Sequence, residues 1–399
     1  MIFLKQTAPL VFAMVIMPFT SLRLGPIGLG EIIFLFIFLL LLVQTRMRLP
    51  GLKGFLFTKF WMAYIAMTVV GAFYNHLFLG SVSGEISLML FDLIAFLVVA
   101  VIVYLLEYKA LTDPGGFRGL AWNVYRLQFL AFAGLHIVSY FQPNILGLPL
   151  RYYVYFTPLV ENVHQTAMLL CSLPFLGLFF LQTKEGLMIK TLLLISFVWY
   201  GVMAFETGTS KAGLGFILGG FVALTMALYS SMNKVFRLSA IVVLISVSTS
   251  VFMWRYEEIL GILTTAFSDA DPASARAILY SKGLEHALNS IFVGYGPGPH
   301  IQFVSGIYSD VHQTFLAIFL QGGLIALTMF LVFLALVLRR VVLNPYLIGG
   351  LASTMIYMTG GDILRRAPMW IFLLTIFYLA RSLRRIKPQD TDYLSPTKR

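Results

Sequence analysis

A few polar residues could do chemistry in an otherwise apolar chain. His312 lies in "YSDVHQTFLAIFLQGG", residues 308–323, immediately before a long apolar run. A neutral histidine can accept a proton near neutral pH, so His312 is a candidate general base. Farther along the run, Gln321 precedes Gly322 and Gly323, and small residues of this kind let a neighbouring helix pack closely.

Basic residues near the ends of apolar segments form a second group. Arg151, Lys211 and Arg276 lie near such ends, as does His312. Taken singly, each could be a side chain that reaches the membrane interface or contacts a lipid headgroup. As a set they predict an anionic ligand. Arginine is well suited to a diphosphate because its planar fork makes paired hydrogen bonds.

Two further stretches place polar side chains beside apolar runs. In "ETGTSKAGLG", residues 206–215, Ser210 lies near the start of a predicted helix. Exposed N–H groups there favour an anion, and an ordinary capped turn is the alternative interpretation. In "PLVENVHQTAML", residues 158–169, His164 stands at the start of another apolar run.

Three ionisable residues fall inside apolar runs, where such groups are costly and usually face the bundle interior. Asp92, Arg126 and His136 could line a transport path or could be internally paired. Asp269 and Asp271 are spaced like a metal-binding acidic pair, although solvated loop acids have the same spacing. No clustered pattern of His and Cys indicates a zinc site.

The composition predicts an all-α polytopic membrane protein. Of 399 residues, 59% are hydrophobic and only 11% are charged, whereas soluble domains carry roughly 25% charged residues. The single cysteine, Cys171, excludes an intrachain disulfide. The net charge of +11 is poor evidence for a nucleic-acid partner, because its distribution follows membrane topology.

Apolar runs of about 20 residues predict about twelve transmembrane helices. With the N-terminus in the cytoplasm, 19 of the 28 basic residues fall inside and eight outside, as the positive-inside rule requires. The first run resembles a retained signal anchor. The predicted spans are 6–22, 28–45, 57–76, 86–106, 119–141, 165–182, 188–205, 212–230, 236–253, 311–338, 345–360 and 368–383.

This pattern divides the chain into four parts. The N-terminal helices occupy 1–253, a long external loop 254–310, the C-terminal helices 311–383, and a cytoplasmic tail 384–399. Within the loop, "DPASARAILYSKGLEHALNSI" has helical periodicity after a proline start, and "GYGPGPH" is a glycine- and proline-rich turn.

The order of these motifs resembles a known family. "ARAILYSKGLEHALNSIFVGYGPG", residues 275–298, followed by "VHQTFLAIFLQGGLIAL", residues 311–327, resembles the signature of the O-antigen ligase and polymerase superfamily. "TGTSKAGLG" resembles its Ser-Arg-Gly element, and "ENVHQTAML" resembles an element common in the polymerases. One departure is Lys211 in place of the arginine, which keeps the charge but loses the fork.

The resemblance implies a GT-C-like architecture with a long periplasmic loop and an activity in lipopolysaccharide biosynthesis. Family members transfer a glycan from undecaprenyl diphosphate to an acceptor hydroxyl at the periplasmic face of the bacterial inner membrane. The implied partners are the lipid-linked oligosaccharide, the glycan acceptor and the bilayer, with a chain-length regulator protein as a further candidate. Neither a cofactor nor a metal is implied.

On this resemblance, His312 is the base, and Arg276 and Lys211 stabilise the leaving diphosphate. The substrate-binding candidates are Arg151, His164, Ser210, Tyr295 and Gln313.

Three functions stay open at this point. An O-antigen polymerase is favoured by "ENVHQTAML", whereas a ligase would join the polysaccharide to the lipid A core. A transporter or flippase would instead use Asp92, Arg126 and His136 as a polar path near the membrane midplane.

Overall fold

Helices dominate the computed structural model of the chain, which describes residues 7–24, 27–46, 51, 53–79, 86–160, 163–231, 273–304 and 307–383. The strands described there form four two-stranded antiparallel hairpins, β1–β2, β3–β4, β5–β6 and β7–β8. In chain order the elements are α2 (Ala8–Ile16), β1 (Arg23–Leu24), β2 (Ile27–Gly28), α3 (Leu29–Gln44), α4 (Leu56–Tyr74), a π-helix η1 (Asn75–Leu79), α5 (Ile86–Thr112), α6 (Pro114–Ser139), β3 (Asn144–Ile145), β4 (Leu148–Pro149), β5 (Arg151–Tyr152), β6 (Tyr155–Phe156), α7 (Val163–Thr183), α8 (Leu187–Glu206), α9 (Ser210–Ser231), α12 (Ala273–Asn289), β7 (Ile301–Val304), β8 (Ile307–Ser309), α13 (Thr314–Val341), α14 (Pro345–Met358) and α15 (Ala367–Leu383).

Apolar helices confirm a multi-pass, all-α membrane protein. Six are long and apolar enough to cross a bilayer, namely Leu56–Phe78, Ser87–Thr112, Val163–Thr183, Leu187–Glu206, Ser210–Ser230 and Thr314–Val341. Leu29–Gln44 and Ala367–Ser382 are apolar but shorter. The predicted number of twelve is therefore not confirmed: α2 has 9 residues and α14 has 14, and the predicted span 236–253 lies outside the described residues.

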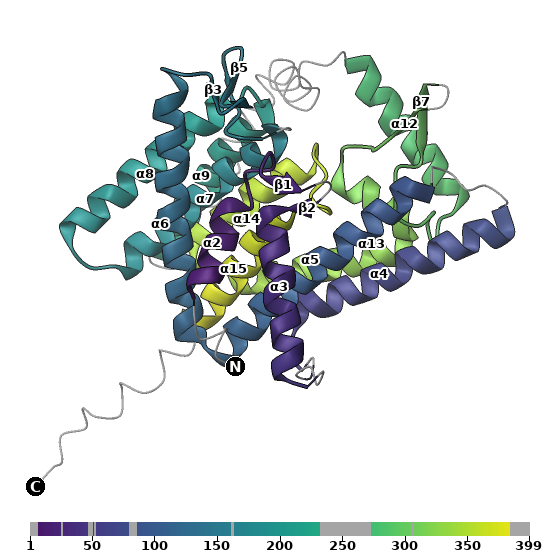
Figure 1. The fold of residues 1–399 in the computed structure, drawn as a ribbon, viewed down its shortest axis with the longest axis horizontal. Helices are drawn as coiled ribbons and strands as arrows, with labels where there is room; N and C mark the ends of the chain where they lie inside the picture. Colours follow the sequence, from purple (N-terminus) through teal and green to yellow (C-terminus); the bar gives the residue numbers. More distant parts are fainter. Residues whose placement is uncertain are drawn as a thin grey trace, which may run out of the picture.

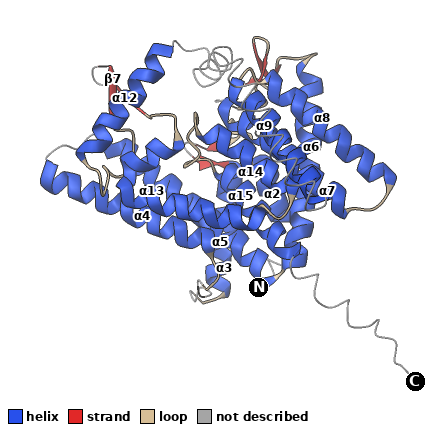
Figure 2. Ribbon diagram, turned by 180° about the vertical axis from the view of Figure 1, so that it is seen from behind, coloured by secondary structure: helices blue, strands red, loops and turns tan. Residues whose placement is uncertain are grey.

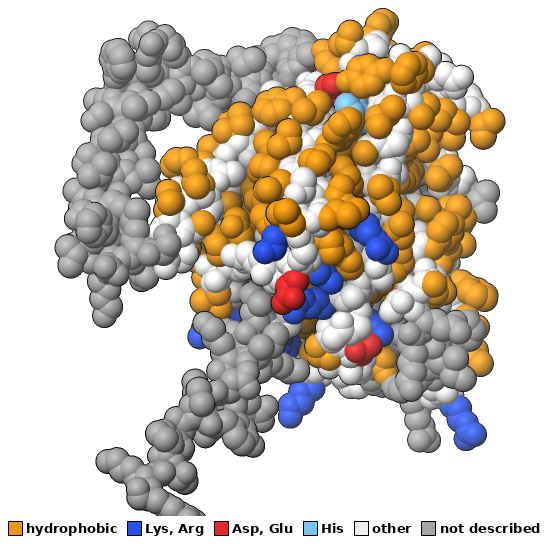
Figure 3. Space-filling view, turned by 90° about the vertical axis from the view of Figure 1, so that its left-hand side faces the viewer, with side chains coloured by type: hydrophobic (Ala, Val, Ile, Leu, Met, Phe, Trp, Pro, Cys, Tyr) orange, Lys and Arg blue, Asp and Glu red, His pale blue; other side chains and the backbone are white. Residues whose placement is uncertain are grey.

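The helices pack in two groups. In one group α7, α8, α9 and α14 pack together, and in the other α4 and α5 pack with α13 and α15. Hairpins β3–β4 and β5–β6 lie at the top of Figure 1, as do β7 and α12, whereas β1–β2 lies near the middle of the view; Figure 2 shows the same arrangement from behind. The face in Figure 3 is largely hydrophobic, and its Lys and Arg side chains gather in its middle and lower parts.

Glycines set the close approach of α9 and α14. A Cβ at Gly219 would lie 2.7 Å from the carbonyl oxygen of Gly349, and one at Gly215 would lie 3.2 Å from that of Ser353. A Cβ at the neighbouring Gly220 would meet nothing within 4 Å. The two backbones therefore approach closely along the edge of α9 that carries Gly215 and Gly219.

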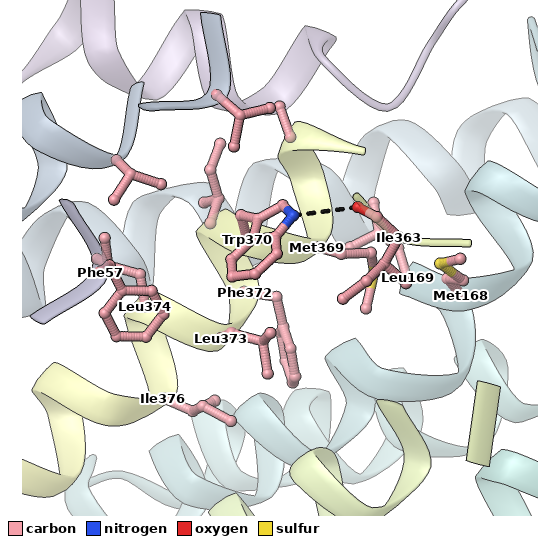
Figure 4. Packing of buried hydrophobic residues seen from close by; sticks show 14 of the residues in the cluster. Phe57, Met168, Leu169, Ile363, Met369, Trp370, Phe372, Leu373, Leu374 and Ile376 are labelled. Carbon is pink, nitrogen blue, oxygen red and sulfur yellow. Dashed lines mark hydrogen bonds between the residues drawn. The ribbon is translucent and has the colours of Figure 1, made fainter. Parts of the chain in front are cut away.

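Aromatic side chains fill the second group of helices. Trp61 and Trp370 are fully buried, with ring centroids 4.7 Å apart. The Trp370 Nε1–H donates to the carbonyl oxygen of Ile363 at 3.1 Å, so the core also holds the segment that precedes α15 (Figure 4). Phe57 packs at the edge of the same cluster.

Helix α13 is broken at Gly323, where φ is 67° and ψ is −167°. The chain after α12 bonds to both sides of the break: the N–H of Tyr295 donates to the carbonyl of Leu320 at 2.7 Å, and the N–H of Leu324 donates to that of Ile291 at 2.7 Å. Gly322 and Gly323 were predicted to let a neighbouring helix pack closely. For Gly323 this was wrong, because the partner is the backbone of the connection from α12 to β7.

Replacing Gly323 with alanine should destabilise the protein. Its φ and ψ belong to a region that is essentially restricted to glycine and that costs other residues about 1–3 kcal/mol, and an added Cβ would overlap the carbonyl of Phe292. Thermal unfolding in detergent should show a clearly lower Tm. The matched control is Gly220→Ala in α9, where a Cβ meets nothing within 4 Å. Equal Tm values for the two variants would contradict this account.

Candidate functional site

A cavity of about 360 Å³ lies where hairpin β1–β2 meets the starts of α13 and α15. Its lining combines ionisable and apolar residues. The ionisable residues are Arg23, Glu31, Asp310, His312, Asp362, Arg365 and Arg366, and Gln165 is a further polar residue. The apolar residues include Phe91, Ile94, Ala95 and Val98, from the N-terminal half of α5. The cavity is thus suited to a ligand with a charged part and an apolar part.

Arg365 is held between two carboxylates from different elements. Its Nη1 donates to Asp92 Oδ1 of α5 at 2.8 Å, and its Nη2 donates to Asp310 Oδ2. Burial alone would lower the pKa of Arg365, but the carboxylates of Asp310 and Asp92 raise it above its ordinary value. The guanidinium therefore stays charged and is fixed at both ends.

Arg366 has a buried donor that no described residue accepts. Its Nε donates to the carbonyl of Asp362 at 2.6 Å, whereas its Nη1 is buried and has no hydrogen-bond partner among the described residues. Burial lowers the pKa of Arg366 from its very high ordinary value. A buried, unsatisfied guanidinium nitrogen is costly, so an anion in the cavity would supply an acceptor that the described residues do not.

Asp362 contributes a carboxyl group to the same cavity. It is buried, and burial raises its pKa above the ordinary value. Its Oδ1 accepts a hydrogen bond from the N–H of Leu364 at 2.9 Å. This bond fixes the turn that directs Arg365 and Arg366 toward the cavity.

Lys211 and Thr314 hold the backbone of the segment 359–366 that carries both arginines. Lys211 is fully buried, and its Nζ donates to the carbonyl of Gly360 at 2.6 Å. The Thr314 hydroxyl donates to the carbonyl of Gly361 at 2.7 Å. Lys211 was predicted to contact a diphosphate; in the structure its ammonium group contacts the backbone of the segment that lines the cavity.

His312 is exposed at the cavity, with a positive φ of 50°. Asp310 precedes it, and Gln313 follows as the N-cap of α13, where its side chain accepts a hydrogen bond from the N–H of Leu316 at 2.5 Å. Gln313, a predicted substrate ligand, is therefore engaged as a helix cap. A non-glycine residue at positive φ is uncommon and persists where neighbouring contacts impose it.

Arg151 lies in a second cluster, apart from the residues that line the cavity. It forms an ion pair with Glu206 at 2.5 Å and donates to the Ser139 hydroxyl at 3.0 Å. Its guanidinium covers the Tyr140 ring at 4.1 Å, and His136 contacts the same Glu206 at 3.2 Å. Glu206 was not among the residues predicted from the sequence, although Glu206 is the first residue of the stretch "ETGTSKAGLG".

The remaining candidates have different surroundings. His164 lies within hydrogen-bond distance of the Tyr357 hydroxyl, with 3.0 Å from Nδ1 to oxygen, while its neighbour Gln165 lines the cavity. Tyr295 stacks on His286 at 4.1 Å. Ser210 begins α9. Arg276 lies in α12, and its side chain is outside the described part of the structure.

The three ionisable residues of the predicted transport path do not share a site. Asp92 pairs with Arg365, His136 contacts Glu206, and Arg126 is exposed and bonded to Asn123 at 3.2 Å. Internal pairing thus accounts for Asp92 and His136. The acids at 269 and 271 lie outside the described residues, within which no group of His, Cys, Asp and Glu could hold a metal ion.

Arg23, Arg365 and Arg366 are cavity arginines that were not among the site residues predicted from the sequence. All three counted among the eight basic residues on the external side, so the same departure from the positive-inside rule could have identified them. No protein-family model matches the chain, and a search of curated proteins finds no similar one.

Proposed function

We propose that the protein is a membrane glycosyltransferase that transfers a glycan from a polyprenyl-diphosphate carrier to an acceptor hydroxyl. One observation carries the proposal: a single cavity combines three arginines, His312 and an apolar wall from α5. A lipid-linked sugar diphosphate has the matching parts, an anionic diphosphate and an apolar tail. The resemblance to O-antigen ligases and polymerases supports the same reaction.

In this proposal Arg366 is the principal diphosphate ligand, because its buried Nη1 lacks a partner among the described residues. Arg23 approaches from hairpin β1–β2, and Arg365 supplies a second charge from the same segment. The polyprenyl chain leaves along α5, where Phe91 and Ile94 are exposed on the outer surface of the helix. Lys211 then acts indirectly, through its bond to Gly360.

The reaction follows from these positions. The neutral imidazole of His312 takes the proton of the acceptor hydroxyl, and the freed oxygen attacks the anomeric carbon of the donor sugar. The bond from that carbon to the diphosphate oxygen breaks, and the electron pair leaves on the diphosphate. Arginine charges at the cavity stabilise the leaving group without protonating it.

The acceptor distinguishes two forms of this activity. We favour a polymerase, which extends another lipid-linked chain, because Gln165 in the polymerase-like stretch "ENVHQTAML" lines the cavity. A ligase, which uses the lipid A core, is the alternative. Deletion of the gene in the native host separates them. Single repeat units on the core indicate a lost polymerase, a bare core indicates a lost ligase, and an unchanged glycan contradicts both.

We further propose that the cavity faces the periplasm from the inner membrane. Tyr153, at the tip of hairpin β5–β6, and Glu185, between α7 and α8, are both exposed and should then lie on opposite sides of the membrane. In a Cys171→Ala background, Tyr153→Cys should react with an impermeant thiol reagent added to the periplasm, and Glu185→Cys should react only after lysis. The reverse labelling pattern would refute this orientation.

A further inference from the structure

We infer that Asp310 is a positioning residue that couples the diphosphate-binding arginines to His312. The inference rests on the proposed function, since it assigns a role within the same site. Its basis is that one ion pair, between Asp310 and Arg365, joins the segment that carries His312 to the segment that carries Arg366.

The ion pair connects two stretches of chain that are remote in sequence. Arg365 belongs to the connection from α14 to α15, and Asp310 belongs to the short link between β8 and α13. The Arg365 guanidinium uses Nη2 for Asp310 and Nη1 for Asp92. Because each carboxylate binds a different nitrogen, Asp310 ties the link that contains His312 to Arg365, whereas Asp92 ties only α5 to the same guanidinium.

His312 needs such an anchor because its backbone conformation is unfavourable for a residue with a side chain. Its φ is 50°, a conformation that residues with a side chain adopt only where their surroundings impose it. On the C-terminal side Gln313 caps α13 and Thr314 bonds to Gly361. On the N-terminal side Val311 is buried in the core and Asp310 pairs with Arg365. Removal of the Asp310 charge removes this ion pair and leaves the contacts on the C-terminal side in place.

Asp92 offers a matched control within the same interaction. It is also an aspartate, it binds the other nitrogen of the same guanidinium, and it lies in α5, remote in sequence from His312. Loss of either carboxylate disturbs Arg365, whereas only loss of Asp310 also releases the link to His312. The two substitutions should therefore affect different kinetic constants.

The experiment compares Asp310→Asn, Asp310→Glu and Asp92→Asn in a transfer assay with lipid-linked donor. Asp310→Asn should lower kcat by about 10- to 100-fold, the order expected when a reacting group is slightly misplaced. Asp310→Glu should recover part of this loss. Asp92→Asn should raise KM for the donor and leave kcat within a few-fold of wild type. Equal losses in the same constant for Asp310→Asn and Asp92→Asn would overturn the inference.

A second measurement keeps the inference separate from the proposed function. Diethyl pyrocarbonate modifies neutral imidazoles, and mass spectrometry of the peptide that contains His312 reports its rate of modification without any substrate. The rate should change in Asp310→Asn and stay at the wild-type value in Asp92→Asn. An unchanged rate in Asp310→Asn would refute the positioning role, whereas a wild-type protein without transfer activity would refute the proposed function alone.

Discussion

Arg366→Ala should lower kcat/KM for glycan transfer by about 10²- to 10³-fold, the loss typical when one donor to a developing anion is removed. The expectation follows from the buried Nη1 of Arg366, which lacks a hydrogen-bond partner among the described residues and lines the cavity. Arg366→Lys should recover only part of the activity, because lysine keeps the charge but loses the planar fork. Initial rates with a purified lipid-linked donor provide the measurement.

Arg126→Ala serves as the control for the loss of an arginine. Arg126 is exposed on α6 and bonds to Asn123, so its removal should change neither activity nor protein level. Full activity in Arg366→Ala, at an equal level of folded protein, would remove Arg366 from the diphosphate site.

The second large effect is expected from the loss of His312, the proposed base for the acceptor hydroxyl. His312→Ala should reduce turnover by about 10²- to 10⁴-fold, as the loss of a general base does, while binding of the lipid donor is retained. His312→Gln should be similarly inactive, because an amide can form hydrogen bonds but does not accept a proton near neutral pH. For the wild type, the rate should fall in acid as the imidazole protonates and loses its acceptor lone pair.

A rival interpretation makes His312 a cation that binds the diphosphate. It predicts better activity in mild acid and partial recovery of activity in His312→Arg. An active His312→Arg variant whose rate does not depend on pH would contradict the base assignment and leave His312 as a phosphate contact.

The sequence predicted the helical, membrane-spanning character well, because runs of apolar residues have few alternatives in a bilayer. It also predicted a helix within the loop 254–310, and the structure has α12 there. The number of spans was harder to predict, since an apolar run such as 345–360 contains a helix of only 14 residues. Apolar composition does not show where a helix begins and ends.

The candidate site was predictable only in part, because side-chain roles depend on contacts between distant segments. From the sequence, His312 and the basic residues predicted to be external were candidates for the site. It could not show that Lys211 would meet the carbonyl of Gly360, or that Arg365 would be shared by Asp92 and Asp310. Likewise, a glycine pair in an apolar run predicts close packing, but only the backbone angles of Gly323 reveal that the helix breaks there.

The most direct test of the proposed activity is transfer by the purified protein. The protein is reconstituted with an undecaprenyl-diphosphate-linked oligosaccharide, which serves as donor and, in the polymerase form, also as acceptor; a lipid A core acceptor is supplied in parallel. The account predicts that the glycan is extended or joined to the core, with release of one undecaprenyl diphosphate per transfer, and that Arg366→Ala and His312→Gln lose this activity. Absence of transfer to either acceptor by well-folded wild-type protein, or wild-type rates in both variants, would contradict it.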